Sequence, residues 1–444
     1  MIVGKIWDCE YPWDVRVEKV TDALLAAGHE VHLMCRNRTG LALHERIGAL
    51  EIHRMPNWPR AGTWFDRASS FPAFMNPRWI RHVLRVSRDA KVDLLLCRDL
   101  PLAPLALWVG RRLGVPVVVD IAENYPAMLK HRFSRREFRL HNLLVRNPFL
   151  AAAVERFVVR RADALLAVVD ESRDRLIQVG APADRVKVVC NTPTTTRIQS
   201  MAEAAEQRGR STSPMRLVYL GLLGHSRGID VTLEALRQLE GSGVDVHFDV
   251  IGGLERDANY PADAAALGIA HRVTFHGHVP YDEALKIVAA ADVGIVPHHA
   301  TEHWRTTIPN KLFDYMAAGV PVLVSDAPPT KRVVEQAGCG LVFADRDAKD
   351  LARCIAALMD PNARRRLGRA GQRAVAAQFN WEMDSERLVS CLEMAYRAGA
   401  SPRRGIAHTG RPRIAALPVA AAVPAPRTAE EETHTAYRRR TPER

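Results

Sequence analysis

Apolar residues recur along the chain in short runs separated by longer amphipathic stretches. Residues 2–7 and 30–35 are runs of strand length, and residues 15–27 between them place apolar side chains at helical spacing. Gly28 follows that helical stretch and is a typical helix stop. Further strand-like runs occupy residues 94–97, 117–120, 164–169 and 186–189. Such alternation of strands and helices predicts a parallel sheet covered by helices on both faces.

The same alternation begins again after a polar segment, and we predict a linker over residues 196–213. Strand-like runs then recur at residues 216–220, 245–251, 273–276, 293–296 and 322–325. The pattern predicts an α/β protein with two Rossmann-like domains, over residues 1–195 and 214–380. A helix over residues 381–397 closes the fold, and the basic, Pro/Ala-rich residues 398–444 lack periodicity, so we expect a disordered tail.

Composition places the chain among ordinary globular proteins, with 444 residues of which 47% are hydrophobic and 25% charged. The seven cysteines are scattered without a Cys-x-x-Cys pair, which argues against a disulfide or zinc framework and favours a reducing compartment. No apolar run reaches the ~20 residues that span a bilayer, and the first residues do not resemble a signal peptide. We therefore expect a cytoplasmic protein.

The net charge of +12 is concentrated in the tail and in the stretch from Lys130 to Arg161. That stretch mixes Arg with Phe and Leu at helical intervals, a pattern typical of helices that bind an anionic membrane surface. It predicts a protein that is peripheral on the inner face of the membrane. A solvated basic face is the alternative. Nucleic acid is not an expected partner, because no nucleic-acid-binding module is present.

Two segments of the second half carry candidate chemistry. In the first, a strand runs into a glycine-containing turn that bears Arg227, a planar cation suited to phosphate, at the start of a helix. In the second, Pro309 opens a helix that places Lys311 and Asp314 on one face, where they could hold a phosphate and a diol. An exposed Arg on an ordinary turn and a surface ion pair between Lys311 and Asp314 are the alternatives.

These segments resemble the retaining GT-B glycosyltransferases of glycosyltransferase family 4, and the resemblance covers residues 11 to 397. It is carried by the sequence Met-Ala-Ala-Gly-Val-Pro-Val that ends the second segment, by Phe-His-Gly-His-Val-Pro at residues 275–280 and by Asp-Ile-Ala-Glu-Asn-Tyr-Pro at residues 120–126. The resemblance implies two domains facing across a cleft, with a nucleotide-diphosphate sugar on the C-terminal one. Arg227 and Lys311 would then hold the diphosphate, and Asp314 the ribose.

The resemblance also implies the remaining contacts. Further donor contacts fall on Gly221, Gly224, Gly228, Thr306, Thr307, Pro309 and Asn310, and acceptor-side contacts fall on Tyr11, Arg16, Glu123 and Asn124. The family's first motif Glu is Thr306 here, its usual His is Ala122, and the Arg that often follows the turn glycine is Leu222. We expect Glu302 or a histidine such as His298 to replace the missing Glu. We expect no metal and no cofactor, although His299, Glu302 and His303 have the spacing of zinc ligands.

The resemblance predicts transfer of a sugar from a nucleotide-diphosphate donor to a saccharide or lipid-linked acceptor with retention of configuration. The products would be cell-surface polysaccharides or glycolipids. Two alternatives stay open from the residues: a GT-B sugar-nucleotide epimerase, and a non-catalytic scaffold that binds nucleotide sugars. Neither half has a G-x-G-x-x-G after its first strand, which argues against a nicotinamide or flavin enzyme.

Overall fold

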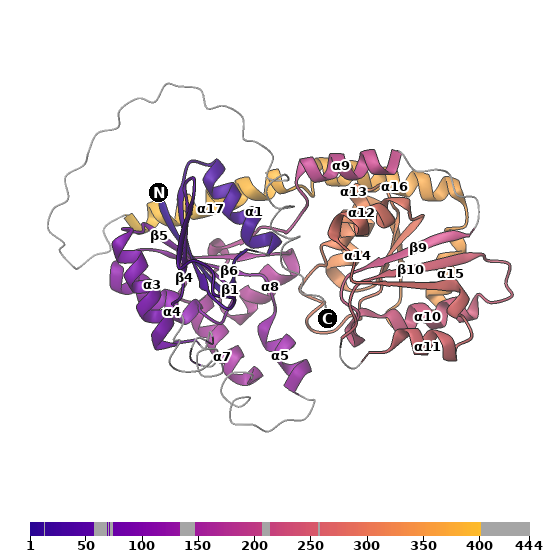
Figure 1. Cartoon of the computed structure of the whole chain (residues 1–444), viewed down its shortest axis with the longest axis horizontal. Coiled ribbons are helices and arrows are strands. Elements are labelled where there is room, and N and C mark those ends of the chain that lie inside the picture. Colours follow the sequence, from indigo (N-terminus) through magenta and orange to yellow (C-terminus); the bar gives the residue numbers. More distant parts are fainter. Residues whose placement is uncertain are drawn as a thin grey trace. The chain divides into compact units, whose positions relative to one another are not determined.

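The computed structural model describes residues 1–12, 14–56, 69, 71, 74–133, 147–206, 214–255 and 258–400. Most of the tail predicted over residues 398–444 lies outside these residues, as does much of the basic stretch after Lys130. Residues 1–401 form one compact unit, which holds two separate β-sheets with their helices (Figure 1). The predicted fold class, two Rossmann-like α/β halves with a C-terminal helix packing back, is confirmed.

The first sheet has eight strands, all parallel to their neighbours except β3, which is antiparallel to β4. Across the sheet the strands are β3 (His44–Ile47), β4 (Leu50–Arg54), β2 (Glu30–Arg36), β1 (Ile2–Glu10), β5 (Leu94–Arg98), β6 (Val117–Ile121), β7 (Ala164–Ala167) and β8 (Val186–Val188). The central strands are apolar on both faces because helices cover both, so they form continuous apolar runs instead of an alternating pattern.

Helices cover both faces of this sheet. One face packs against α3 (Pro77–Asp89), α4 (Ala103–Leu113), α7 (Pro148–Val159) and α8 (Asp170–Val179), and α5 (Tyr125–Phe133) lies beside α7 (Figure 1). The other face packs against α1 (Val15–Ala26) and α17 (Trp381–Ala400). Asp14 caps α1 by accepting a hydrogen bond from the backbone N–H of Val17 at 2.9 Å, which fixes where the chain turns from β1 into the helix.

The second sheet has six strands, and every neighbouring pair is parallel. Across the sheet they are β11 (Val273–Gly277), β10 (Val246–Ile251), β9 (Met215–Leu220), β12 (Val293–Val296), β13 (Val322–Ser325) and β14 (Gly340–Phe343). One face packs against α10 (Ile229–Gln238), α11 (Tyr260–Ala266) and α15 (Ala348–Ala357). The other packs against α9 (Thr195–Glu206), α12 (Tyr281–Ala290), α13 (Lys311–Ala317), α14 (Pro328–Ala337) and α16 (Pro361–Ala377).

The segment predicted as a linker is helical in its described part. Residues 195–206 form α9, and Ile198 and Met201 are buried against the second sheet's helices. These two apolar residues are three apart, so one helix face is buried although the segment is polar overall. The polar composition of the segment does not reveal this helix, because composition averages over both faces.

The closing helix returns the chain to the first sheet. Lys19 of α1 stacks on the ring of Trp381, 4.5 Å from its centroid, and Thr192 donates a hydrogen bond of 2.6 Å to the carboxylate of Asp384. The helix runs to Ala400, three residues past its predicted end. Within the described part of the chain, no helix combines the length and the apolar character needed to cross a membrane.

Candidate active site

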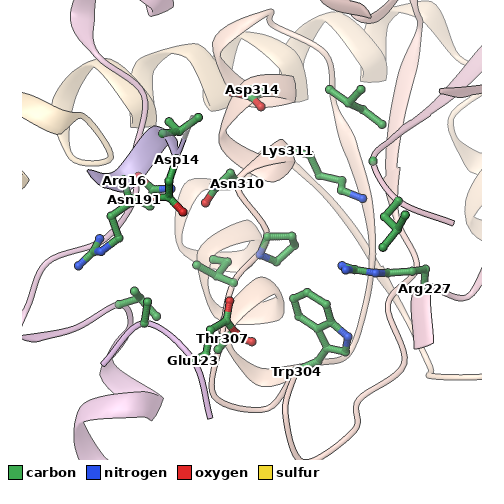
Figure 2. A pocket seen from close by; sticks show the side chains of 18 of the residues that line it. Asp14, Arg16, Glu123, Asn191, Arg227, Trp304, Thr307, Asn310, Lys311 and Asp314 are labelled. Carbon is green, nitrogen blue, oxygen red and sulfur yellow. The ribbon is translucent and has the colours of Figure 1, made fainter. Parts of the chain in front are cut away.

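A cavity of about 490 Å³ lies where the carboxyl ends of both sheets meet (Figure 2). The first strand of each half, β1 or β9, lies inside its sheet, and the strands that follow it in the sequence lie on both sides of it. The strand order therefore reverses at β1 and at β9. Ligands of open α/β sheets bind at such switch points. From the first half the cavity is lined by Asp14, Arg16, Arg98, Glu123 and Asn191. From the second half it is lined by Gly221, Arg227, Trp304, Thr307, Pro309, Asn310, Lys311 and Asp314.

Arg227 is placed by the glycine turn that follows β9. It ends the short 3₁₀ helix η3 (His225–Arg227), and its guanidinium lies 4.7 Å from the ring centroid of Trp304. Gly228 has φ +68°, and a Cβ there would overlap the carbonyl oxygen of Pro297. A Cβ on Gly224 would likewise overlap the carboxylate of Glu255. The glycines at these positions therefore let the turn pack closely enough to aim Arg227 into the cavity.

Lys311 begins α13 and is buried at the same end of the cavity. Its Nζ lies 3.6 Å from the ring centroid of Tyr219 and 3.4 Å from Nε2 of His298. Burial, and then the charge of Arg227, holds the pKa of Lys311 well below its usual range. Burial and the neighbouring cations also hold the pKa of His298 well below its usual range. Among the described residues, no carboxylate forms an ion pair with Arg227 or Lys311, so the geometry favours an anionic ligand.

Asp314, one helical turn after Lys311, has a different partner. Its carboxylate accepts a hydrogen bond of 2.9 Å from Nη2 of Arg197 on α9. Burial raises the pKa of Asp314, and the charge of Arg197 opposes that rise. Because Lys311 and Asp314 are both buried, the alternative of a surface ion pair between them is excluded.

The first half contributes a buried network of charges. Arg16 forms two hydrogen bonds with Asp120, of 2.9 and 2.7 Å, and Arg98 lies 3.5 Å from carboxylate oxygens of both Asp120 and Asp14. Nη1 of Arg16 is buried and has no hydrogen-bond partner among the described residues. Much of the charge of Arg16 is thus neutralised by Asp120, and the arginine joins α1 to β6 as well as lining the cavity.

The two halves touch through the residues after β6. Nε2 of His303 lies 3.2 Å from the carboxylate of Glu123, and the side-chain amide of Asn124 donates a hydrogen bond of 3.2 Å to the hydroxyl of Thr306. Burial raises the pKa of Glu123, and Arg98 and Arg227 oppose the rise. Of these residues only Glu123 lines the cavity.

Seven predicted site residues do not line the cavity: Gly224, Gly228, His298, Glu302 and Thr306 of the second half, and Tyr11 and Asn124 of the first. Tyr11 is half-buried against the core beneath α1, and its carbonyl accepts a hydrogen bond from Arg54. Glu302 is exposed and pairs with Lys130 at 3.4 Å, so it does not replace the missing motif Glu. Thr306 itself is engaged by Asn124. The loop turns at residues 301–305, which directs Glu302 toward α5 and brings Trp304 and Thr307 to the cavity instead.

The histidines of that loop are also separated. His299 bonds to Asp345 at 2.8 Å, whereas His303 faces Glu123 and His298 faces Lys311. Within the described residues, no group of three converging metal-ligand atoms includes this loop. The alternative of a zinc site on His299, Glu302 and His303 is therefore not supported.

Several residues in or beside the cavity were not predicted from the sequence, among them Arg98, Asn191, Arg197 and Trp304. Arg98 directly follows a predicted strand, so the rule that ligands bind at the carboxyl ends of strands could have found it. Arg197 lies in the segment that was predicted as a linker. Nothing in the local sequence indicates that Trp304 lines the cavity.

Comparison with known proteins agrees with this architecture. The family model described as "Glycosyl transferase 4-like domain" matches residues 14–192, and that of "Glycosyl transferases group 1" matches residues 200–374. Glycogen synthase of Mycobacterium tuberculosis is 24% identical over 406 residues, which are 87% of this chain and 92% of that protein. D-inositol 3-phosphate glycosyltransferase of Nocardia farcinica is 28% identical over 57% of each chain.

Solved structures show the same fold at low sequence identity. Sucrose-phosphate synthase from Thermosynechococcus elongatus has a TM-score of 0.68 at 18% identity, over 89% of this chain and 99% of that one. HepE of Anabaena, solved in complex with UDP, has a TM-score of 0.61 at 16% identity, over 89% and 100%. Together the two family models match most of the chain, one in each half, and the chain belongs to the GT-B glycosyltransferases of family 4.

Proposed function

We propose that this glycosyltransferase takes its sugar from a nucleotide-diphosphate donor and transfers it with retention of the anomeric configuration. The observation that carries the proposal is the pair of cations, Arg227 and Lys311, which face one cavity without a carboxylate partner among the described residues. Such a pair of cations suits a diphosphate. Because Gly221 has no side chain, a diphosphate can approach the amino group of Lys311.

In the proposed reaction, the bond between the anomeric carbon and the diphosphate oxygen breaks. The acceptor oxygen bonds to the same face of that carbon, and its proton passes to the departing diphosphate. Arg227 and Lys311 stabilise the charge that develops on the diphosphate, and fixed charges of this kind supply much of a barrier reduction. Asp314 accepts hydrogen bonds from the ribose. This chemistry requires no metal and no cofactor, so a chelator should leave the rate unchanged.

HepE, a neighbour of the same fold, has been solved with UDP-glucose. That complex supports UDP-hexoses as the first donors to test. The acceptor, a saccharide or a lipid-linked saccharide, would approach from the first half, where Glu123 and Arg98 line the cavity. We propose a role in the synthesis of cell-surface polysaccharide or glycolipid.

We also propose that the enzyme works in the cytoplasm, peripheral on the inner face of the membrane. On α7, Phe149 is 80% exposed and Phe157 is 43% exposed, and the guanidinium of Arg161 lies 4.1 Å from the ring centroid of Phe157. Aromatic rings beside cations are typical of surfaces that bind anionic lipid. Co-sedimentation with phosphatidylglycerol vesicles, but not with phosphatidylcholine vesicles, should be lost in a Phe149→Ser, Phe157→Ser double variant.

The donor assignment is tested by calorimetry with UDP, GDP, ADP and TDP, followed by turnover with the matching nucleotide sugars. Arg227→Ala should weaken binding of the nucleoside diphosphate by at least about tenfold, because a charged hydrogen bond contributes about 1.5–3 kcal/mol, while affinity for the nucleoside changes little. His225→Ala, an exposed change in the same turn, is the control.

Turnover separates the alternatives. A transferase releases nucleoside diphosphate only when an acceptor is added, an epimerase converts the donor without one, and a scaffold binds the nucleotide sugar without converting it. Equal affinity of wild type and Arg227→Ala for every diphosphate would contradict the proposed donor site.

A further inference from the structure

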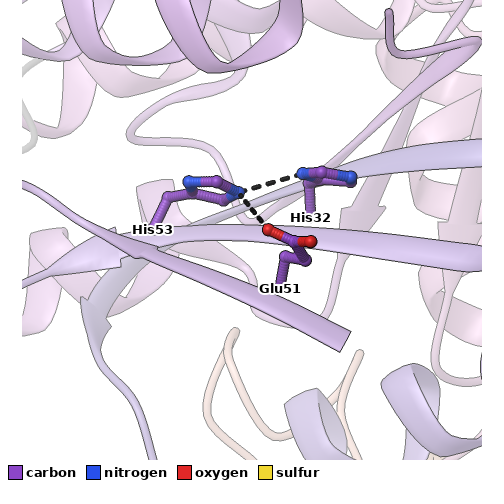
Figure 3. A group of neighbouring side chains, drawn as sticks. All are labelled: His32, Glu51 and His53. Atoms are coloured by element: carbon purple, nitrogen blue, oxygen red, sulfur yellow. Dashed lines mark hydrogen bonds and ion pairs between the residues drawn. The ribbon is translucent and has the colours of Figure 1, made fainter. Parts of the chain in front are cut away.

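A second cavity, of about 340 Å³, lies on the first sheet between the strands β2 and β4 and the C-terminal half of α3. It shares no lining residue with the active-site cavity. Three metal-ligating side chains, His32, Glu51 and His53, line it together (Figure 3). Neither the family models nor the proposed transfer reaction gives these three residues a role, and their chemistry differs from that of the surrounding apolar core.

Strand register brings these residues together. His32 on β2 pairs with Glu51 on the parallel strand β4, and His44 on β3 pairs with His53 on the other side of β4. Glu51 and His53 are two apart, so they project from the same face of their strand. Leu50 and Ile52, the alternate residues, are buried on the opposite face, where α1 and α17 pack. The cluster therefore results from the pairing of strands that neighbour one another at the edge of the sheet.

The donor atoms converge. Nδ1 of His32 lies 2.9 Å from Nε2 of His53, and Nε2 of His53 lies 4.0 Å from Oε2 of Glu51. One ligand atom from each residue lies within 4.8 Å of the others. Two imidazoles and one carboxylate are a ligand set that zinc and similar ions use.

Neighbouring carboxylates orient the cluster as outer-shell groups do in metal sites. The other nitrogen of His32, Nε2, lies 2.9 Å from the carboxylate of Glu30, which favours the tautomer that carries its proton there. Nδ1 of His32 then presents a lone pair to Nε2 of His53, so either a proton or a cation must lie between the two rings. His44 lies 2.6 Å from Oε2 of Glu51 and orients that carboxylate in the same manner.

The charges around the cluster are mixed. Arg46 lies 3.4 Å from Glu51, and Arg85 of α3 lines the cavity, and both oppose a cation. Asp89 of α3 lines the same cavity and favours one.

We propose that His32, Glu51 and His53 bind a divalent transition-metal ion of the zinc class. Metal–nitrogen bonds of about 2.0–2.1 Å in tetrahedral geometry hold two nitrogens about 3.3 Å apart, so His32 and His53 need to separate by only a few tenths of an ångström. A water molecule completes the coordination. Because the ligands come from adjacent strands at the edge of the sheet, the ion joins β4 to β2 and stabilises the fold of the first half.

The test uses the full chain without an affinity tag, stripped with a chelator and then titrated with zinc chloride by calorimetry and with cobalt chloride by visible absorption. Wild type should bind one zinc ion at this site, and the cobalt complex should show the intense d–d bands of a four-coordinate ion. His53→Gln and Glu51→Gln should each weaken that binding by more than about tenfold. His271→Gln, an exposed histidine outside the cluster, should leave it unchanged.

Zinc should also raise the melting temperature of the wild type and of His271→Gln, because a ligand of the native state stabilises it. Zinc should not raise the melting temperature of Glu51→Gln. This variant changes the rim of the cavity and provides the test if His53→Gln fails to fold. Binding of zinc with the same stoichiometry and affinity in wild type and Glu51→Gln would overturn the proposal, and so would the absence of zinc binding in the wild type.

Discussion

The guanidinium of Arg197 lies 2.9 Å from the carboxylate of Asp314. This ion pair joins α9, the first helix after the first sheet, to α13, the helix that carries Asp314. Asp314 is the residue that the family resemblance assigns to the ribose. A buried carboxylate costs free energy unless it is paired, and Arg197 supplies the pair. The proposed nucleotide contact thus depends on a residue from a segment whose composition predicts a linker.

Changing this pair should weaken nucleotide binding. Asp314→Asn removes a charged acceptor, so we expect the dissociation constant for the nucleoside diphosphate to rise at least about tenfold. Arg197→Met should raise it less, and the double variant should be no worse than Asp314→Asn, since the two residues act as a unit. Calorimetry measures all three, with the exposed Glu234→Gln as the charge-matched control. Additive losses would show that Arg197 acts independently of Asp314.

Binding of the diphosphate should take up a proton through Lys311. Burial and Arg227 lower the pKa of this lysine in the free enzyme, and a bound anion raises it again. Between the two pKa values the complex holds one more proton than the free enzyme, so affinity should fall as the pH rises through that window.

Calorimetry in buffers of different ionisation enthalpy measures this uptake directly. Lys311→Arg keeps the positive charge at every accessible pH, so the uptake should disappear in that variant while binding persists. An undiminished uptake in Lys311→Arg would assign the proton to another group.

Gly228 should tolerate no side chain. Its φ of +68° strains any other residue, and a Cβ would overlap the carbonyl oxygen of Pro297. We expect Gly228→Ala to lower the free energy of unfolding by more than about 2 kcal/mol, because both backbone strain and overlap must be relieved.

Gly241→Ala is the matched control for that experiment. Gly241 has a φ of +73° but nothing within 4 Å of a built Cβ, so only the strain of about 1–2 kcal/mol applies. Urea unfolding compares the two variants. Equal losses would mean that the turn before α10 has room for a methyl group.

Breaking the Arg16–Asp120 pair should destabilise the first half. Both side chains are buried, so Arg16→Met leaves the carboxylate of Asp120 with the more distant Arg98, at 3.5 Å, and should cost up to about 3–5 kcal/mol of unfolding free energy.

The pH dependence of that loss follows from the direction of the Asp120 shift. Burial alone would raise the pKa of Asp120, but attraction and hydrogen bonding from Arg16 outweigh it, and the folded-state pKa lies below its usual value. The contribution of the pair is therefore present above the unfolded-state pKa and is lost as the pH falls through the folded-state pKa. Urea unfolding measures the difference in the free energy of unfolding between wild type and Arg16→Met. This difference should be smaller at acidic pH than at neutral pH. A difference independent of pH would point to packing of the arginine stem instead.

Local sequence was sufficient for the architecture. Apolar runs marked the strands, and helical spacing of apolar residues marked α1 and α10. The same alternation began again at the strand that starts at Met215. All of these signals arise because buried side chains recur with the short period of a strand or a helix. The sequence also predicted a shared site for Arg227, Lys311 and Asp314, through the resemblance of their segments to the family's motifs, and all three line one cavity.

Only the tertiary structure decided which side chains meet. Arg197 reaches Asp314, Asn124 reaches Thr306, and Glu302 turns away to Lys130, although sequence spacing indicates none of these contacts. In the same manner the pairing of β2 with β4 brings His32 beside Glu51 and His53, although about twenty residues separate them in the sequence. Secondary structure is fixed by interactions between residues a few positions apart, whereas a site depends on distances between segments that only the packed fold sets.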